Sequence, residues 1–167
     1  MVESIVNSMV GFFRDSIPRE LVVFIISLFP ILELRGGMIA AKLLDVDFLK
    51  AFFICYAGNI LPIPFILLFI RKIFRFLKRF NKIGKIIEKL EVRSMRKSDS
   101  VKKYRLWGLL AFVGIPLPGT GGWTGSLIAA LLDIRISHSF PVIALGILIA
   151  NVIMSIFSYG LLGAIGL

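Results

Sequence analysis

The sequence predicts an all-α integral membrane protein with two inverted repeats. Each repeat is a re-entrant helical hairpin followed by a transmembrane helix, and a basic amphipathic helix joins them. Hydrophobic residues make up 57% of the 167 residues, and the mean hydropathy is +0.91. A core of this size cannot bury so much apolar surface, so lipid must solvate the remainder. Pro and Gly interrupt two of the apolar stretches, and a shift of 88 positions aligns the two halves of the chain.

The charges are concentrated in the middle of the chain. Net charge is +10, and residues 71–105 hold 14 of the 20 Lys and Arg against three acidic residues. Such a stretch can bind nucleic acid, but between apolar spans it is typical of a cytoplasmic loop held against anionic lipid. We therefore expect one domain, 1–167, in the cell inner (plasma) membrane. Its linker, 71–105, would face the cytoplasm, and its partners would include membrane lipids but no nucleic acid.

The first repeat covers residues 21–70. Before it, residues 4–17 predict a short amphipathic helix at the membrane interface. Within the repeat, residues 21–44 are apolar except for three charged residues, and a pair of glycines interrupts them. Residues 48–70 form a longer apolar stretch of roughly 34 Å as a helix, which is enough to cross a bilayer. Two prolines at 62 and 64 predict a kink in that helix.

The linker and the second repeat follow the same logic. Residues 71–90 place apolar side chains at helical spacing with Lys and Arg on the other faces, which predicts a basic amphipathic helix on the inner leaflet. The second repeat covers residues 106–165. Its first part, 106–132, has no charged residue but several prolines and glycines, a composition that does not suit a lipid-facing helix. Its second part, 140–165, is an uninterrupted apolar span.

The 88-residue shift gives nine identities between positions 30–69 and the second half, without gaps. The most specific is the sequence LLD, which follows the broken segment in each half. If the broken segments cross the membrane, the repeats are parallel. If they enter and return as hairpins, the repeats are inverted. Pro and Gly near the middle of each broken segment favour hairpins, so we prefer inverted repeats and keep parallel repeats as the alternative.

Glu33 and Arg35 lie in the first break, directly before Gly36 and Gly37. A charge at the bilayer centre costs about 3 kcal/mol. Two residues apart, these side chains would not share a face of a regular helix, but at a hairpin tip they can converge. One interpretation is a neutralising pair that fixes the hairpin. We favour a substrate or proton site, in which Arg35 holds an anionic group and Glu33 carries a proton or orients Arg35.

The second break contains the other candidate residues. Irregular backbone at membrane depth requires burial in protein or a watery cavity, and each break begins a half-helix whose N–H groups attract anions. The two breaks should therefore face each other or share a cavity. A tight tip in which glycine serves only close packing is the alternative. The candidates here are Pro118, Gly119, Thr120, Gly121, Gly122, Trp123, Thr124 and Gly125.

Asn59 and Asn151 occupy similar positions in the two intact spans and can either form interhelical hydrogen bonds or line the pocket. The sequence shows no metal-ligand cluster and no nucleophile–base pair, so we expect no enzyme, no metal site and no cofactor. A chain this small does not easily enclose a pathway alone, so we expect a homodimer.

These motifs carry a family resemblance. The chain resembles the small multidrug export proteins over nearly its whole length, through LELRGG at 32–37, PLPGTGGWTG at 116–125 and the two LLD stretches. This implies export of small molecules. The architecture is also similar to that of the DedA superfamily, whose paired re-entrant hairpins are linked to proton-coupled movement of lipid phosphates. In that superfamily the essential arginine lies in the second hairpin, whereas here Arg35 lies in the first.

Together these features predict a small membrane transporter, proton-coupled, with a pocket between two hairpins. Its substrate would be an anionic or amphipathic small molecule or a lipid phosphate. The alternative is a non-transporting scaffold or partner subunit that binds anionic lipid through the basic linker.

Overall fold

The computed structural model describes residues 2–13, 17–96 and 99–161, and the regular secondary structure in these residues is helical. Short turns connect the helices, and the predicted all-α class is confirmed. Residues 14–16 of the predicted interfacial helix 4–17 and residues 162–165 of the predicted span 140–165 lie outside the described residues. The helices are α1 (Val2–Phe13), α2 (Arg19–Leu28), α3 (Glu33–Leu43), α4 (Phe48–Ile60), α5 (Ile63–Leu77), α6 (Asn81–Arg96), α7 (Asp99–Tyr104), α8 (Leu106–Gly114), α9 (Gly122–Leu131) and α10 (Ile136–Ser155), followed by the π-helical turn η1 (Ile156–Leu161).

Two long apolar helical stretches are candidates to cross a membrane. Phe48–Phe76 has 29 residues and Ile136–Gly160 has 25, and the most apolar 18-residue windows within them have mean hydropathies of 2.1 and 2.4. Both exceed the length that a bilayer requires. The first contains the break between α4 and α5 at Leu61 and Pro62, as expected where prolines remove N–H donors. It also continues beyond the predicted end of the span, because α5 runs to Leu77.

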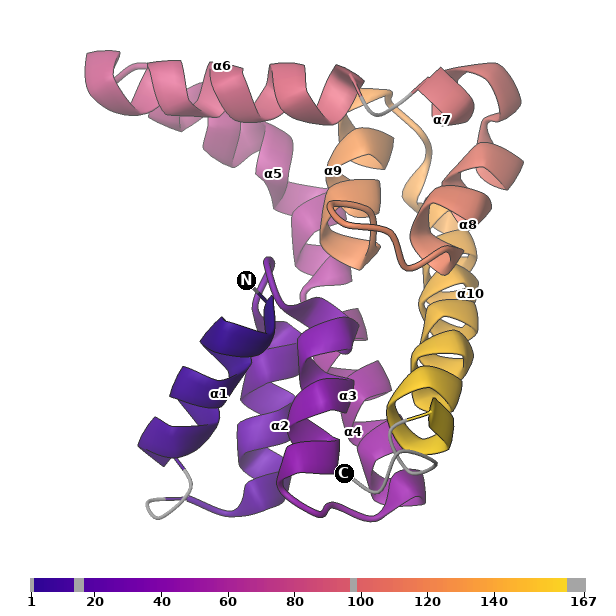
Figure 1. Ribbon diagram of the computed structural model, residues 1–167. Helices are drawn as coiled ribbons and strands as arrows, with labels where there is room; N and C mark the ends of the chain where they lie inside the picture. Colours follow the sequence, from indigo (N-terminus) through magenta and orange to yellow (C-terminus); the bar gives the residue numbers. More distant parts are fainter. Residues whose placement is uncertain (1, 14–16, 97–98, 162–167) are drawn as a thin grey trace.

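The predicted linker is divided among three helices. Residues 71–77 complete α5, α6 then crosses the upper end of the molecule, and α7 precedes the second half (Figure 1). The buried side chain of Ile87 anchors α6 by packing with Phe74 of α5 and Leu127 of α9. The amphipathic pattern therefore does not describe one free helix, because part of its apolar face packs against the rest of the protein.

Two pairs of short helices approach one another from opposite ends. The pair α2–α3 lies in the lower half and the pair α8–α9 in the upper half, and their connecting turns meet near mid-height (Figure 1). These connections are residues 29–32 and 115–121, within or next to the predicted breaks. The long helices α4–α5 and α10 pass beside both pairs (Figure 1).

The turns after α3 and α9 have the same geometry. Asp45 and Asp133 both adopt positive φ, 51° and 57°, a conformation that Asp tolerates better than most residues. In the same way, Val46 N–H donates to Ala41 O at 2.9 Å, and Ile134 N–H donates to Ala129 O at 3.0 Å. The equivalent helix ends are Leu43 and Leu131, and the next helices begin at Phe48 and Ile136.

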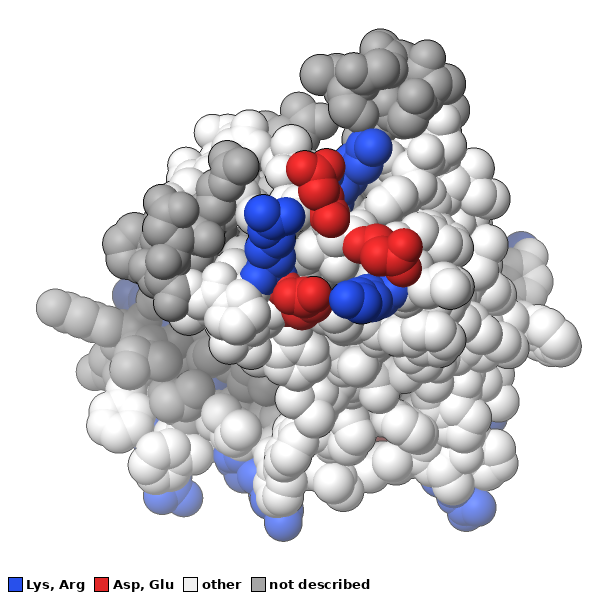
Figure 2. Space-filling model, turned by 90° about the horizontal axis from the view of Figure 1, so that it is seen from below, with Lys and Arg blue, Asp and Glu red and all other residues white. Residues whose placement is uncertain are grey.

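The two ends of the molecule differ in charge. On the lower end, acidic and basic side chains lie beside one another (Figure 2). There Glu20 and Lys50 form an ion pair at 3.8 Å, and Arg19 donates to Leu44 O at 3.1 Å. The upper end carries the basic residues of α5, α6 and α7. Cationic side chains concentrate on the cytoplasmic side of membrane proteins, and the cytoplasmic position of the linker stays a prediction.

Candidate functional site

Glu33 begins α3 in an uncommon backbone conformation. Its φ is 48°, which is sterically costly for a residue with a side chain. The side chain is only 7% exposed, and its Oε1 accepts a hydrogen bond from the N–H of Trp123 at 3.2 Å. Because α9 begins at Gly122, this carboxyl group satisfies one of the free N–H groups in the first turn of α9. A residue from the first half of the chain therefore caps a helix of the second half.

Gly121 leaves the space that this contact needs. It is the N-cap residue of α9 and has a φ of 135°. A Cβ atom added there would overlap Glu33 Oε2 and lie 2.8 Å from Glu33 Cδ. Both the backbone conformation and the available space thus require glycine.

Arg35 also reaches across to the second half. Its Nη2 donates to the backbone O of Thr120 at 2.9 Å and to Thr120 Oγ1 at 3.2 Å. The same hydroxyl holds the α8–α9 connection together, since it accepts from Leu117 N–H at 3.1 Å. Glu33 and Arg35, both within the described chain, form no ion pair with each other. Each instead binds the opposite helix pair.

Trp123, in the second half of the chain, binds the end of a helix in the first half. Its indole Nε1–H donates to Leu28 O at 3.2 Å, and Leu28 is the last residue of α2. The last carbonyl groups of a helix have no partner within the helix. Glu33 therefore caps the start of α9 while Trp123 caps the end of α2.

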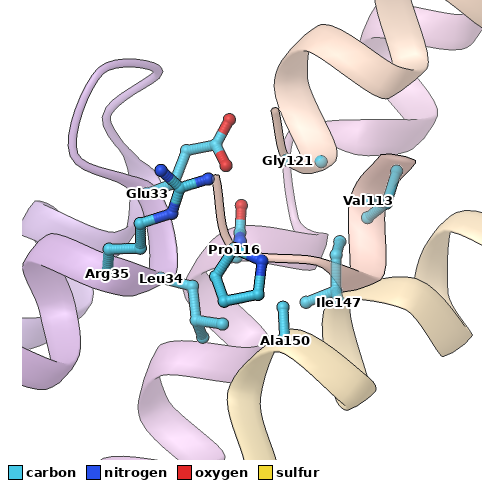
Figure 3. A pocket seen from close by; sticks show the side chains of 10 residues that line it. Glu33, Leu34, Arg35, Val113, Pro116, Gly121, Ile147 and Ala150 are labelled. Carbon is cyan, nitrogen blue, oxygen red and sulfur yellow. The ribbon is translucent and has the colours of Figure 1, made fainter. Parts of the chain in front are cut away.

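A small cavity lies against this contact. Its volume is about 10 Å³, enough for roughly one water molecule. The Glu33 and Arg35 side chains extend towards the side occupied by Pro116 and Gly121 (Figure 3). Asn59 also lines the cavity, and its buried Oδ1 has no hydrogen-bond partner among the described residues. The lining residues are Glu33, Leu34, Arg35, Asn59, Val113, Pro116, Gly121, Gly122, Ile147 and Ala150.

Asn151 lies away from this cavity. Its Nδ2 donates to Phe52 O at 2.9 Å and so joins α10 to α4. The structure thus separates the two predicted asparagines: Asn59 lines the cavity and Asn151 forms an interhelical hydrogen bond.

Three of the predicted glycines serve helix packing. A Cβ on Gly36 would lie 3.2 Å from Ile26 Cγ2 of α2, and one on Gly125 would lie 2.5 Å from Val113 Cγ2 of α8. A Cβ on Gly37 would overlap the Ser27 hydroxyl. These glycines allow helices to approach closely.

The remaining predicted residues lie around the contact. Pro118 and Gly119 are exposed in the α8–α9 connection, and Thr124 is half-buried in the first turn of α9. Sequence reasoning did not assign Leu34, Val113, Ile147 and Ala150 to the cavity. These side chains are apolar, and in such a chain an apolar residue carries no signal that separates cavity lining from packing or lipid contact.

Comparison with known proteins gives one match. The model of the family described as "Putative small multi-drug export protein" matches residues 33–153. This range begins at Glu33, directly after the α2–α3 connection, and includes the α8–α9 connection and most of α10. Neither the curated proteins nor the solved structures give a match. Because the family match covers well over half of the sequence, the chain belongs to the small multi-drug export protein family.

Proposed function

We propose that this protein is a proton-coupled membrane transporter. It moves an anionic or amphipathic small molecule, or a lipid phosphate, through a site between two re-entrant helix pairs. The observation that supports this most directly is that Glu33 bonds to the first turn of α9 while Arg35 holds Thr120, two residues before that helix. A helix N-terminus beside a guanidinium group is a favourable anion site.

The proposed topology has two inverted repeats. Helices α3 and α9 have 11 and 10 residues, or ~15 Å each, which is half of a typical hydrocarbon core of ~30 Å. Residues 88 positions apart touch at two places. Gly121 abuts Glu33, and Tyr56 OH donates to Ala144 O at 3.3 Å. Equivalent residues meet in this way near a two-fold axis. The helix pairs α2–α3 and α8–α9 enter from opposite ends of the molecule (Figure 1), which supports inverted rather than parallel repeats.

In the proposed mechanism, the Glu33 carboxylate and the substrate anion compete for the N–H groups at the start of α9. With Glu33 ionised, its carboxylate occupies the α9 N-terminus and repels a second anion. A proton on Glu33 removes that charge, and a substrate anion can then bind the N–H groups of α9 and the Arg35 guanidinium. Binding of the anion and uptake of the proton are therefore linked, as coupled transport requires.

Substrate entry requires the helix pairs to separate, because a volume of about 10 Å³ admits no drug-sized molecule. Hydrogen bonds from Arg35 to Thr120 and from Trp123 to Glu33 and Leu28 connect the pairs at their tips. Contacts between the tips of two helix pairs suit an interface that opens and closes as one repeat moves against the other. A homodimer would supply further walls for the pathway.

Flux in proteoliposomes tests this proposal. The probe is a short-chain phosphatidate, with a pH-sensitive dye inside the liposomes. We expect Arg35→Ala to reduce phosphatidate flux by about tenfold or more, and Glu33→Gln to abolish the accompanying proton movement. Arg19→Ala and Glu20→Gln at the lower end are matched controls that should behave as wild type. Wild-type flux and proton movement in both site variants would refute the mechanism.

A second candidate function is a lipid-binding scaffold. It is favoured by α6, where Ile86 and Val92 are 61% and 60% exposed beside basic residues, an arrangement suited to the membrane surface. A scaffold would lose activity when the Lys and Arg of α6 are neutralised, and it would tolerate Glu33→Gln.

A further inference from the structure

A second and larger cavity lies at the basic end of the molecule. It opens between the α7–α8 junction and the turn that connects α9 to α10, and its volume is about 600 Å³. This falls within the usual range for sites that hold small molecules. It shares no lining residue with the cavity at Glu33.

Two guanidinium groups in this cavity are available to bind a ligand. Arg105 and Arg135 both line it, and neither side chain forms an ion pair or hydrogen bond with any described residue. The acid in the lining, Asp133, is paired with Arg71 of α5. The local field is therefore positive, and Arg is the side chain best suited to bind a phosphate through two hydrogen bonds.

Both arginines immediately precede a helix. Arg105 is the N-cap residue of α8 and Arg135 is that of α10, and neither side chain caps its helix. The positive ends of two helices therefore point towards the same region as the guanidinium groups. Arg105 also adopts a φ of 47° and a ψ of −113°, a costly conformation of the kind that is found at functional sites.

Half of the residues that line the cavity are apolar. Val101, Leu106 and Ile134 are among them, and Val101 is almost fully buried at 1% exposure. His138 lies at the edge, with Nδ1 3.3 Å from Ser137 Oγ. Cations beside apolar side chains match an amphiphile with an anionic head rather than a simple inorganic ion.

The corresponding turn at the lower end lacks these features. Residue 47, at the position equivalent to Arg135, is an aspartate. The backbone of that turn is already occupied, since Arg19 donates to Leu44 O at 3.1 Å and Tyr159 OH donates to Val46 O at 2.8 Å. Related turns therefore have opposite electrostatic character, and only the upper one presents unpaired arginines.

We propose that the cavity between Arg105 and Arg135 binds the phosphate group of an anionic amphiphile. The guanidinium groups hold the phosphate, and the half-buried side chains of Leu106 and Ile134 contact the apolar part of the ligand. A membrane lipid head group and a soluble phosphate compound share this chemistry. The site does not depend on the transport mechanism proposed for Glu33 and Arg35.

The test measures ligand binding to the detergent-purified full chain. Native mass spectrometry follows titration with phosphatidylglycerol and, as the zwitterionic control, phosphatidylcholine. The double variant R105Q/R135Q is compared with K72Q/K85Q, which removes two charges from exposed positions on α5 and α6. We expect phosphatidylglycerol to bind about tenfold more weakly to the cavity variant and to change less than about twofold for the control. Equal losses in both, or no loss in either, would overturn the proposal.

Two further measurements complete the test. Ile134→Trp places a larger side chain in the wall beside Arg135 and retains both arginines, so it should also weaken phosphatidylglycerol binding, and it replaces the double variant if that does not fold. Unfolding temperature is then measured with inorganic phosphate at constant ionic strength. If phosphate raises the unfolding temperature of the wild type but not of R105Q/R135Q, soluble phosphate compounds are ligands. If phosphate does not raise the unfolding temperature and phosphatidylglycerol binds, the ligand is the lipid head group. If Ile134→Trp binds phosphatidylglycerol like wild type, the cavity is not the site.

Discussion

Glu33 Oε2 occupies the space into which a side chain at position 121 would extend. The two residues lie 88 positions apart, which is the interval that aligns the two halves of the sequence. The first half of the chain supplies the carboxyl group of Glu33, and the second half has a glycine at the equivalent position, which leaves room for that group. The two halves therefore differ in sequence at the place where equivalent positions touch.

Gly121→Ala should displace the Glu33 carboxyl group from the first turn of α9. The overlap with Glu33, together with the φ of 135°, should cost about 1–3 kcal/mol in the free energy of unfolding. Thermal unfolding in detergent measures this loss. In a double-mutant cycle with Glu33→Ala, part of the loss should disappear, because the overlapping atoms are gone. Gly11→Ala, where no atom lies within 4 Å, is the control. Strict additivity in the cycle would contradict the overlap.

Trp123→Phe should loosen the contact between the helix pairs while retaining an aromatic ring. It removes the N–H that binds Leu28 O, a loss of about 1 kcal/mol. Hydrogen–deuterium exchange of residues 117–123 should accelerate as a result. The comparison variant is Trp107→Phe, because Trp107 is 78% exposed and its loss should leave exchange in that segment unchanged. Equal exchange in the two variants would mean that the indole does not hold the tips together.

Arg35→Lys should impair transport even though the charge is preserved. Arg35 holds both the carbonyl and the hydroxyl of Thr120, whereas Lys presents a single charged point on a flexible chain. We expect a reduction of about tenfold in the flux of the short-chain phosphatidate. Thr120→Ser keeps the hydroxyl and should transport like wild type, whereas Thr120→Val should resemble Arg35→Lys. Normal flux in Arg35→Lys would show that charge alone is sufficient.

Glu33→Gln should remove the pH dependence of anion binding. In the wild type, anion binding should strengthen as pH falls, since a proton on Glu33 ends the competition for the α9 N-terminus. The amide cannot ionise, so the variant should bind a short-chain phosphatidylglycerol, whose phosphodiester keeps one negative charge, equally well across the pH range. Equilibrium binding at several pH values measures this, with Glu20→Gln as the control that keeps the wild-type profile. A wild-type profile in Glu33→Gln would assign the pH dependence to another group.

The sequence located the elements of the fold more reliably than the roles of individual residues. The helix breaks are found within or next to 30–37 and 116–125, and apolar spans follow Asp45 and Asp133. Pro and Gly act on the backbone locally, so their positions can be read from the chain itself. The end of the first span was less predictable. Helix α5 continues into the basic segment as far as Leu77, because basic residues do not interrupt helical hydrogen bonding.

The roles of the glycines and of the charged residues required the three-dimensional structure. Gly37 and Gly121 look alike in the sequence, yet one packs against Ser27 and the other makes room for Glu33. Likewise, the sequence left two interpretations of Glu33 and Arg35, a neutralising pair and a substrate or proton site, and only the structure shows that both side chains bind the opposite helix pair.

By itself, the sequence determined that the protein is helical and suited to a membrane, where its helices break and which end is basic. These properties follow from backbone chemistry and from hydrophobicity, which each residue carries wherever it lies. Only the tertiary structure decided that Glu33 caps α9, that Trp123 caps α2 and that Arg105 and Arg135 border one cavity. Those relationships join residues far apart in the chain, and they depend on how the helices pack rather than on any local preference.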